Sequence, residues 1–182
     1  MRICVFCGSS RGNDPQYREA AHELGTELTR AGIEIVYGGG NIGLMGALAD
    51  AALAAGGRVI GVIPHALAAR EVAHTGLTQL HLVDSMHERK ALMADLSDGF
   101  VALPGGFGTF EEFCEVVTCV QLGIIAKPTY LLNIDGYYDP LIAMFDRANT
   151  EGFINDHNRA IVDIIDAVGG LIARINPSGI AR

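Results

Sequence analysis

Residues 104–112, Pro-Gly-Gly-Phe-Gly-Thr-Phe-Glu-Glu, carry the strongest chemical signal in this chain. Three glycines and a threonine stand where an apolar run gives way to a helical pattern. Backbone amides at the start of a helix favour an anion, and glycine lets a ligand approach the backbone closely. We therefore predict that this segment wraps a phosphate and that Glu112 lies beside it, placed to act on the attached sugar. Thr109 and Glu112 also have capping-box spacing, so a purely structural interpretation of both residues stays open.

A second group, Met-His-Glu-Arg-Lys at 86–90, opens the preceding helical pattern. Arg89 and Lys90 fall near the start of that helix, where the helix dipole disfavours cations. The chain has only two lysines, and one of them stands here beside an arginine. We interpret the pair as a partner for a phosphate or a transition-state charge; a solvated surface pair is the structural alternative. His87 is interpreted as a solvated or capping residue, and Met86 and Met93 as packing residues.

Two more glycine groups follow apolar runs, and from them we expect Gly8, Ser9, Gly40 and Gly43 to contact a ligand. Gly38, Gly40 and Gly43 match the spacing G-x-G-x-x-G of dinucleotide sites. That motif also needs an acidic residue at the end of the next strand, and the run 58–64 ends in Pro64, so we do not expect a dinucleotide. The chain contains no Walker A loop and no G-x-S-x-G elbow, and we expect no cysteine to stand at a glycine loop, which argues against nucleophilic catalysis.

The elements that must position these residues alternate along the chain. Apolar runs at 2–6, 33–37, 58–64, 79–83, 99–104, 128–133 and about 161–165 predict strands, and helical patterns separate them, including helices at about 109–123 and 138–150. Continuous apolar strands indicate a mostly parallel sheet with helices on both faces, a doubly wound Rossmann-like α/β fold. Such sheets bind ligands at the carboxyl ends of their strands, where the glycine groups fall. No linker or repeat divides the chain, so we expect a single domain over 1–182.

Composition limits the partners and the compartment. The formal net charge is −8 and no charge run interrupts the 182 residues, which argues against a nucleic-acid or anionic-membrane surface. The four cysteines include a C-x-x-C pair, Cys4 and Cys7, whose members face opposite sides of a strand, so we expect neither a disulfide nor a metal site. With no signal-peptide layout and no membrane-spanning apolar run, we expect a cytoplasmic protein.

The motifs P-G-G-x-G-T-x-x-E and M-H-x-R-K together resemble the LOG family of cytokinin riboside 5′-monophosphate phosphoribohydrolases. The similarity runs from C-G-S-S through G-G-G-N-I-G-L-M-G to Q-L-G-I-x-x-K-P and D-G-Y-Y, nearly the whole chain. It implies that Arg89 and Glu112 form the catalytic pair and that the loop from Gly106 to Glu112 cradles phosphate and ribose. The substrate contacts expected besides this pair are Gly105, Gly106, Phe107, Gly108, Thr109, Phe110, Glu111, Lys90, Glu71 and Thr118.

The resemblance implies hydrolysis of the N-glycosidic bond of adenosine 5′-monophosphates, plain or N6-substituted. It also points to a homodimer, as does the predicted helix at 109–123, which is too apolar all round for one face to meet water. The sequence contains no metal-ligand cluster, so we expect neither a metal nor another cofactor. The name "lysine decarboxylase", long given to relatives, finds no support, because Lys90 and Lys127 are the only candidates for a pyridoxal-phosphate lysine. Two alternatives stay open: a nucleotide-binding or sensing protein without turnover, which would not need Glu112, and a hydrolase specific for plain AMP. Adenine and N6-prenyladenine both require only apolar walls, so the preferred base is also open.

Overall fold

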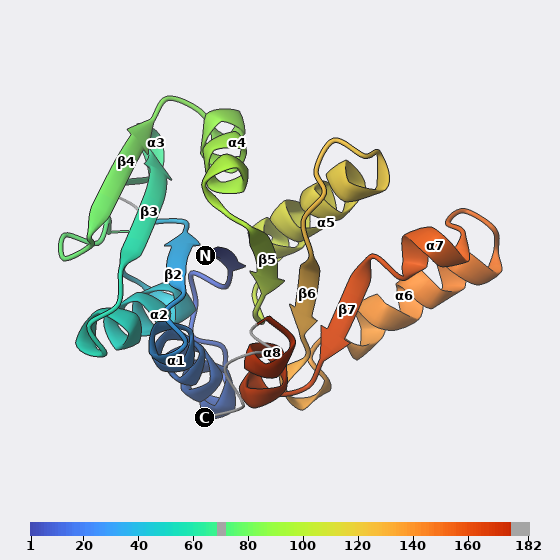
Figure 1. Ribbon diagram of the computed structural model, residues 1–182, viewed down its shortest axis with the longest axis horizontal. Helices are drawn as coiled ribbons and strands as arrows, with labels where there is room; N and C mark the ends of the chain where they lie inside the picture. Colours follow the sequence, from blue (N-terminus) through green and yellow to red (C-terminus); the bar gives the residue numbers. More distant parts are fainter. Residues whose placement is uncertain (69–71, 176–182) are drawn as a thin grey trace.

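The computed structural model describes residues 1–68 and 72–175. Its elements follow the chain in this order: β1 Arg2–Phe6, α1 Pro15–Arg30, β2 Glu34–Tyr37, α2 Gly43–Ala54, β3 Val59–Pro64, α3 His65–Ala68, β4 Gln79–Val83, α4 Met86–Leu96, β5 Gly99–Ala102, α5 Phe107–Gln121, β6 Thr129–Leu132, the 3₁₀ turn η1 Ile134–Gly136, α6 Asp139–Thr150, α7 Asp156–Arg159, β7 Val162–Ile165 and α8 Val168–Ile175 (Figure 1). The seven predicted strands are all present. The short helices α3 and α7 and the turn η1 were not predicted.

The strands form one parallel sheet in the order β4-β3-β2-β1-β5-β6-β7. β1 lies between β2 and β5, and Cys4 pairs with Val36 on one side and Phe100 on the other. Chain connections run outward from β1 in both directions, so the carboxyl ends of β1, β2 and β5 meet at the switch point of a doubly wound sheet. The predicted fold class is confirmed.

Helices cover both faces of this sheet (Figure 1). On one face, α1, α2 and α8 pack against alternate strand residues such as Ile3, Val5 and Ile35. On the other face, α4, α5 and α6 pack against Cys4, Phe6 and neighbouring strand residues. Cys4 and Cys7 therefore belong to opposite layers, as the period of a strand requires, and none of the four cysteines forms a disulfide.

Polar side chains cap the starts of two helices. Asp14 caps α1 by accepting a hydrogen bond from the amide of Gln16, with Pro15 at the first helical position. Ser85 caps α4 by accepting from the amide of Glu88. Within the described ranges, no helix is long and apolar enough to cross a membrane.

Candidate active site

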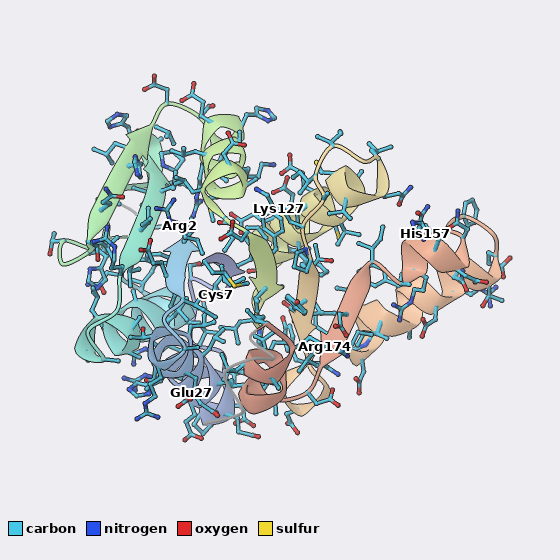
Figure 2. All side chains as sticks on the ribbon, in the orientation of Figure 1. Arg2, Cys7, Glu27, Lys127, His157 and Arg174 are labelled. Carbon is cyan, nitrogen blue, oxygen red and sulfur yellow. The ribbon has the colours of Figure 1, made fainter. Side chains whose placement is uncertain are left out.

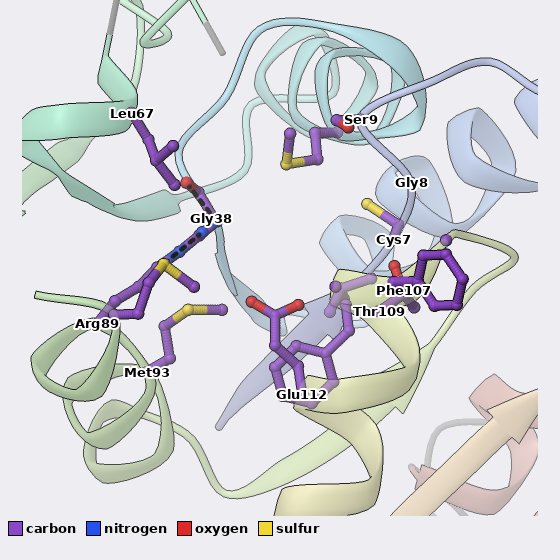
Figure 3. A pocket seen from close by; sticks show the side chains of 16 residues that line it. Cys7, Gly8, Ser9, Gly38, Leu67, Arg89, Met93, Phe107, Thr109 and Glu112 are labelled. Carbon is purple, nitrogen blue, oxygen red and sulfur yellow. Dashed lines mark hydrogen bonds between the residues drawn. The ribbon is translucent and has the colours of Figure 1, made fainter. Parts of the chain in front are cut away.

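A cavity of about 240 Å³ opens where the carboxyl ends of β1, β2 and β5 meet (Figure 3). Loops after all three strands contribute to its wall. The helices α4 and α5, which cover one face of the sheet, form another part of the wall. The predicted ligand edge of the sheet is thus hollowed in the structure. Eight of the residues expected to bind ligand or catalyse line this cavity: Gly8, Ser9, Arg89, Gly106, Phe107, Gly108, Thr109 and Glu112.

The segment predicted to cradle a phosphate is the start of α5. This helix begins at Phe107 with Gly106 as its N-cap, and no side chain accepts a capping hydrogen bond there. The first amides of a helix have no intrahelical partner, so those of Phe107, Gly108 and Thr109 are available to an anion. Thr109 and Glu112 lie inside the helix, so their interpretation as a capping box is wrong. The sequence pattern placed the helix start two residues too late because glycines near the start weaken the helical signal.

Two tyrosines of the D-G-Y-Y segment hold the loop before the cradle. The hydroxyl of Tyr137 donates a short hydrogen bond to the carbonyl of Gly105, and that of Tyr138 donates to the carbonyl of Leu103 at 2.6 Å. The side chain of Asn133 accepts from the amide of Tyr138 at 2.7 Å and so fixes the start of this segment. Gly105 lies directly against Thr109, where only glycine fits: a Cβ at position 105 would lie 2.1 Å from the hydroxyl of Thr109.

Arg89 reaches the cavity from the second turn of α4. Its side chain is 5% exposed, and its Nη2 donates to the carbonyl of Gly38 at the end of β2, 3.1 Å away. The carboxylate of Glu88 accepts from the amide of Asp84 at 2.9 Å, which fixes the start of the helix together with the Ser85 cap. The position of Arg89 is therefore set by the sheet edge as well as by its own helix.

Glu112 approaches from the opposite wall. It is 8% exposed, and its carboxylate points into the cavity from α5, across from Arg89 (Figure 3). Burial raises the pKa of the Cys4 thiol well above its ordinary value, and the negative charge of Glu112 raises it further. A carboxylate and a guanidinium on facing walls, beside uncapped helix amides, can together bind an anion and act on a reacting carbon next to it.

Seven of the expected contacts are not among the described residues that line this cavity: Gly40, Gly43, Gly105, Phe110, Glu111, Lys90 and Thr118. Gly43 has a φ of +63°, and a Cβ there would lie 2.3 Å from the carbonyl carbon of Ser9, so this glycine lets α2 approach the β1 loop. Thr118 lies on the outer face of α5, where it lines a second cavity with residues near α6 and α7. Glu71 lies outside the described residues.

Lys90 and Glu111 contact each other and do not face the cavity. The Nζ of Lys90 lies 2.5 Å from Oε1 of Glu111 and 2.7 Å from Oε2 of Glu115. Burial lowers the pKa of Lys90, but the hydrogen bonds and charges of the two carboxylates outweigh this effect and raise it above its ordinary value. The ammonium is thus held charged between α4 and α5.

Sequence reasoning missed eight residues of the cavity wall: Val5, Phe6, Cys7, Gly38, Met45, Leu67, Met86 and Met93. Cys7 lies near the centre of the molecule, directly before the Gly8 loop (Figure 2), so the expectation that no cysteine stands at a glycine loop is wrong. Gly38 could have been found from the run of three glycines. The methionines carry no such signal, because a packing residue and a wall residue look alike in sequence.

The described residues contain no group of three or more His, Cys, Asp or Glu side chains that could hold a metal ion. The polar groups of the cavity are instead backbone amides, one carboxylate, one guanidinium and hydroxyls. This set suits an anionic organic ligand better than a cation.

Comparisons with known proteins show the family of this chain. A family model described as "Possible lysine decarboxylase" matches residues 45–175. The chain is 54% identical over 161 residues to the probable cytokinin riboside 5′-monophosphate phosphoribohydrolase LOGL1 of Oryza sativa subsp. japonica, covering 88% of this chain and 72% of that protein. It is 53% identical over 161 residues to the cytokinin riboside 5′-monophosphate phosphoribohydrolase LOG1 of Arabidopsis thaliana, covering 88% and 76%.

A solved structure shares the fold at lower identity. The molybdenum cofactor binding protein of Rippkaea orientalis superposes with a TM-score of 0.72 at 22% identity, over 97% of this chain and 95% of that one. That likeness concerns the fold alone. The family model and the close relatives decide the family: the chain belongs to the LOG family of cytokinin riboside 5′-monophosphate phosphoribohydrolases.

Proposed function

We propose that this protein hydrolyses the N-glycosidic bond of adenosine 5′-monophosphates, with Arg89 and Glu112 as its catalytic pair. The products are the free base and ribose 5-phosphate. One observation carries the proposal: the carboxylate of Glu112 and the guanidinium of Arg89 face one cavity, beside the uncapped amides of α5. The relatives named phosphoribohydrolases support the same chemistry.

The 5′-phosphate binds at the start of α5. The protein carries a formal net charge of −8, so local groups must hold an anion against the overall field. Uncapped amides and the positive end of the helix dipole supply that attraction. The hydroxyl of Ser9 lies on the neighbouring wall and completes the cradle.

Cleavage of the bond builds positive charge on the ribose in an oxocarbenium-like transition state. A carboxylate near the anomeric carbon stabilises this charge, activates a water molecule, or attacks the carbon directly. Glu112 takes one of these roles. Arg89 orients that carboxylate, contacts the phosphate or assists the departing base. Binding of the phosphate, which does not react, supplies energy that positions the sugar.

The base occupies the apolar side of the cavity, where Met45, Leu67, Met86 and Met93 form the wall. Flexible thioether side chains adapt to flat and branched groups alike. Both adenine and an N6-prenyl adenine therefore fit this chemistry, and the names of the relatives favour the substituted base.

The experiment is incubation of purified protein with AMP and, separately, with isopentenyladenosine monophosphate, followed by assay of ribose 5-phosphate. Release from either nucleotide supports the proposed activity, and the ratio of the two kcat/KM values gives the base preference. Tight nucleotide binding with no release from either substrate would instead favour a sensing protein without turnover.

We also propose that the protein is a cytoplasmic homodimer. Large apolar side chains are exposed after α5 and around α6 and α7, namely Leu122, Ile124, Met144 and Phe153. Contiguous exposed apolar surface is typical of an interface, and a second copy is the occupant that the family resemblance implies. Thr118 lies on this outer side of α5, away from the cavity of its own chain, so contact with substrate would require a second copy. Four cysteines without a disulfide fit a reducing compartment.

A further inference from the structure

Arg89 and Glu112 stand on two helices that are separated by a groove. This groove has a volume of about 460 Å³ and is lined from one side by α4 and from the other by α5. Where a groove runs between two helices, close packing of side chains does not fix their spacing. Both helices pack on the sheet, and a direct contact across the groove can further fix the distance between them beside the cavity.

The side chain of Lys90 spans this groove. Its Nζ contacts Glu111 at 2.5 Å and Glu115 at 2.7 Å, and the side chain is 13% exposed. Lys90 follows Arg89 directly, and Glu111 directly precedes Glu112. Consecutive helix residues point about 100° apart, so Arg89 and Glu112 face the cavity while their neighbours join the helices beside it.

The second lysine of the chain holds the other end of the same helix. Lys127, which precedes β6, donates from Nζ to the carbonyl of Ala94 at 2.8 Å (its position is labelled in Figure 2). A cation at this position satisfies a carbonyl of the last turn of α4 and complements the helix dipole. Both lysines thus fix α4, the helix that carries Arg89.

The charge of Lys90 persists over the working pH range of an enzyme. The pKa of Lys90 is raised in the folded protein. The ion pairs of Lys90 therefore contribute fully to the stability of the fold as pH rises toward the ordinary lysine pKa of 10.5, and this contribution is lost only as pH rises further through the higher folded pKa. The bridge needs an ammonium close to two carboxylates, and Lys90 lies within ion-pair distance of both.

We propose that Lys90 is a positioning residue, which holds α4 against α5 through Glu111 and Glu115 and thereby sets the separation of Arg89 and Glu112. This role replaces the substrate contact expected from the sequence, and it rests on the proposed roles of Arg89 and Glu112. The chemistry stays with that pair; Lys90 acts through the two helices.

The test is a mutant cycle read as kcat and KM separately. Lys90→Gln should lower kcat about tenfold or more and change KM little, because small misplacements of reacting groups cost rate rather than affinity. The double variant Glu111→Gln/Glu115→Gln should show the same loss, and the triple variant should be no worse than either, since all three remove one bridge. Lys90→Arg should restore most of kcat, because a guanidinium can also contact two carboxylates.

If Lys90 contacts the substrate directly, the opposite pattern is expected, and either of two results would overturn the proposal. Lys90→Gln would then raise KM with kcat kept, or the double glutamate variant would turn over at the parental rate. Arg147→Gln is the matched control: it breaks an exposed ion pair with Glu151 on α6 and should leave both constants unchanged.

Two further measurements distinguish a wrong positioning role from a variant that does not fold and from a wrong catalytic pair. A thermal melt is recorded for each variant. If Lys90→Gln does not fold, Glu115→Gln alone, which leaves Glu111 in contact with the ammonium, should still show a smaller drop in kcat; an unchanged kcat for that variant counts against the proposal. Glu112→Gln is assayed in parallel. If it loses turnover while Lys90→Gln keeps the parental kcat, only the positioning role is wrong; if Glu112→Gln itself keeps the parental rate, the proposed catalytic pair is wrong.

Discussion

The guanidinium of Arg89 occupies the space that a side chain at Gly38 would need. Nη2 of Arg89 donates to the Gly38 carbonyl at 3.1 Å, and a Cβ on Gly38 would lie 2.0 Å from that same nitrogen. The first glycine of the triple-glycine run is therefore explained by the arginine that packs on it, 51 residues later in the chain.

Gly38→Ala should displace Arg89 and lower kcat/KM by about tenfold or more, since a shift of this size misplaces a catalytic group. Overpacking of a buried site should also cost about 1–3 kcal/mol of stability. Gly169→Ala on α8 is the control, because a Cβ there meets nothing within 4 Å. Kinetics and thermal melts of both variants test this, and unchanged kinetics for Gly38→Ala would mean that the position of Arg89 does not matter.

The 5′-phosphate should be required for turnover. Loss of several charge-assisted hydrogen bonds, each worth about 1.5–3 kcal/mol, implies a decrease of orders of magnitude in kcat/KM. The measurement is hydrolysis of AMP beside adenosine under the same conditions. Comparable rates for nucleoside and nucleotide would show that the start of α5 is not a phosphate cradle.

Activity should need neither a metal nor pyridoxal phosphate. The cavity presents one carboxylate and backbone amides, and Lys90 and Lys127 are engaged with acceptors away from its wall. Full activity should survive dialysis against EDTA, and the protein should show no absorbance of a pyridoxal Schiff base. A titratable requirement for an added divalent ion, or recovery of activity on adding pyridoxal phosphate, would contradict this.

The fold and part of the site follow from the sequence for a physical reason. A strand buried on both faces is a continuous apolar run, and glycines that end such runs mark the ligand edge of a parallel sheet. Arg89, Glu112 and the loop 106–109 were found in this way, helped by the family motifs.

Other parts depend on contacts between distant segments, which no local pattern encodes. Gly38 lines the cavity and accepts a hydrogen bond from Arg89 of α4, a contact between residues far apart in the chain. Lys90, expected to contact the substrate, lies against Glu111 and Glu115, one turn apart on α5 across the groove. Such outcomes are decided by the packing of α4 beside α5, which sequence spacing does not fix.

The dimer proposal predicts a mass near two chains in solution. Burying the apolar side chains around Leu122 and Phe153 would contribute roughly 25 cal/mol for each Å² removed from water. Sedimentation at micromolar concentration should give the dimer, and Phe153→Asp should shift the equilibrium toward one chain. A single-chain mass for the parental protein would contradict the proposal.

The most direct test of the proposed catalysis is Glu112→Gln, measured as hydrolysis rate and nucleotide binding on the same preparation. Glutamine has nearly the same shape, and Glu112 caps no helix here, so the fold and most nucleotide affinity should be kept. Turnover should fall roughly a hundredfold or more, the usual scale for removing an acid–base or electrostatic group. Arg89→Ala should lose turnover as well. A Glu112→Gln protein that folds, binds AMP and releases base at the parental rate would contradict the account.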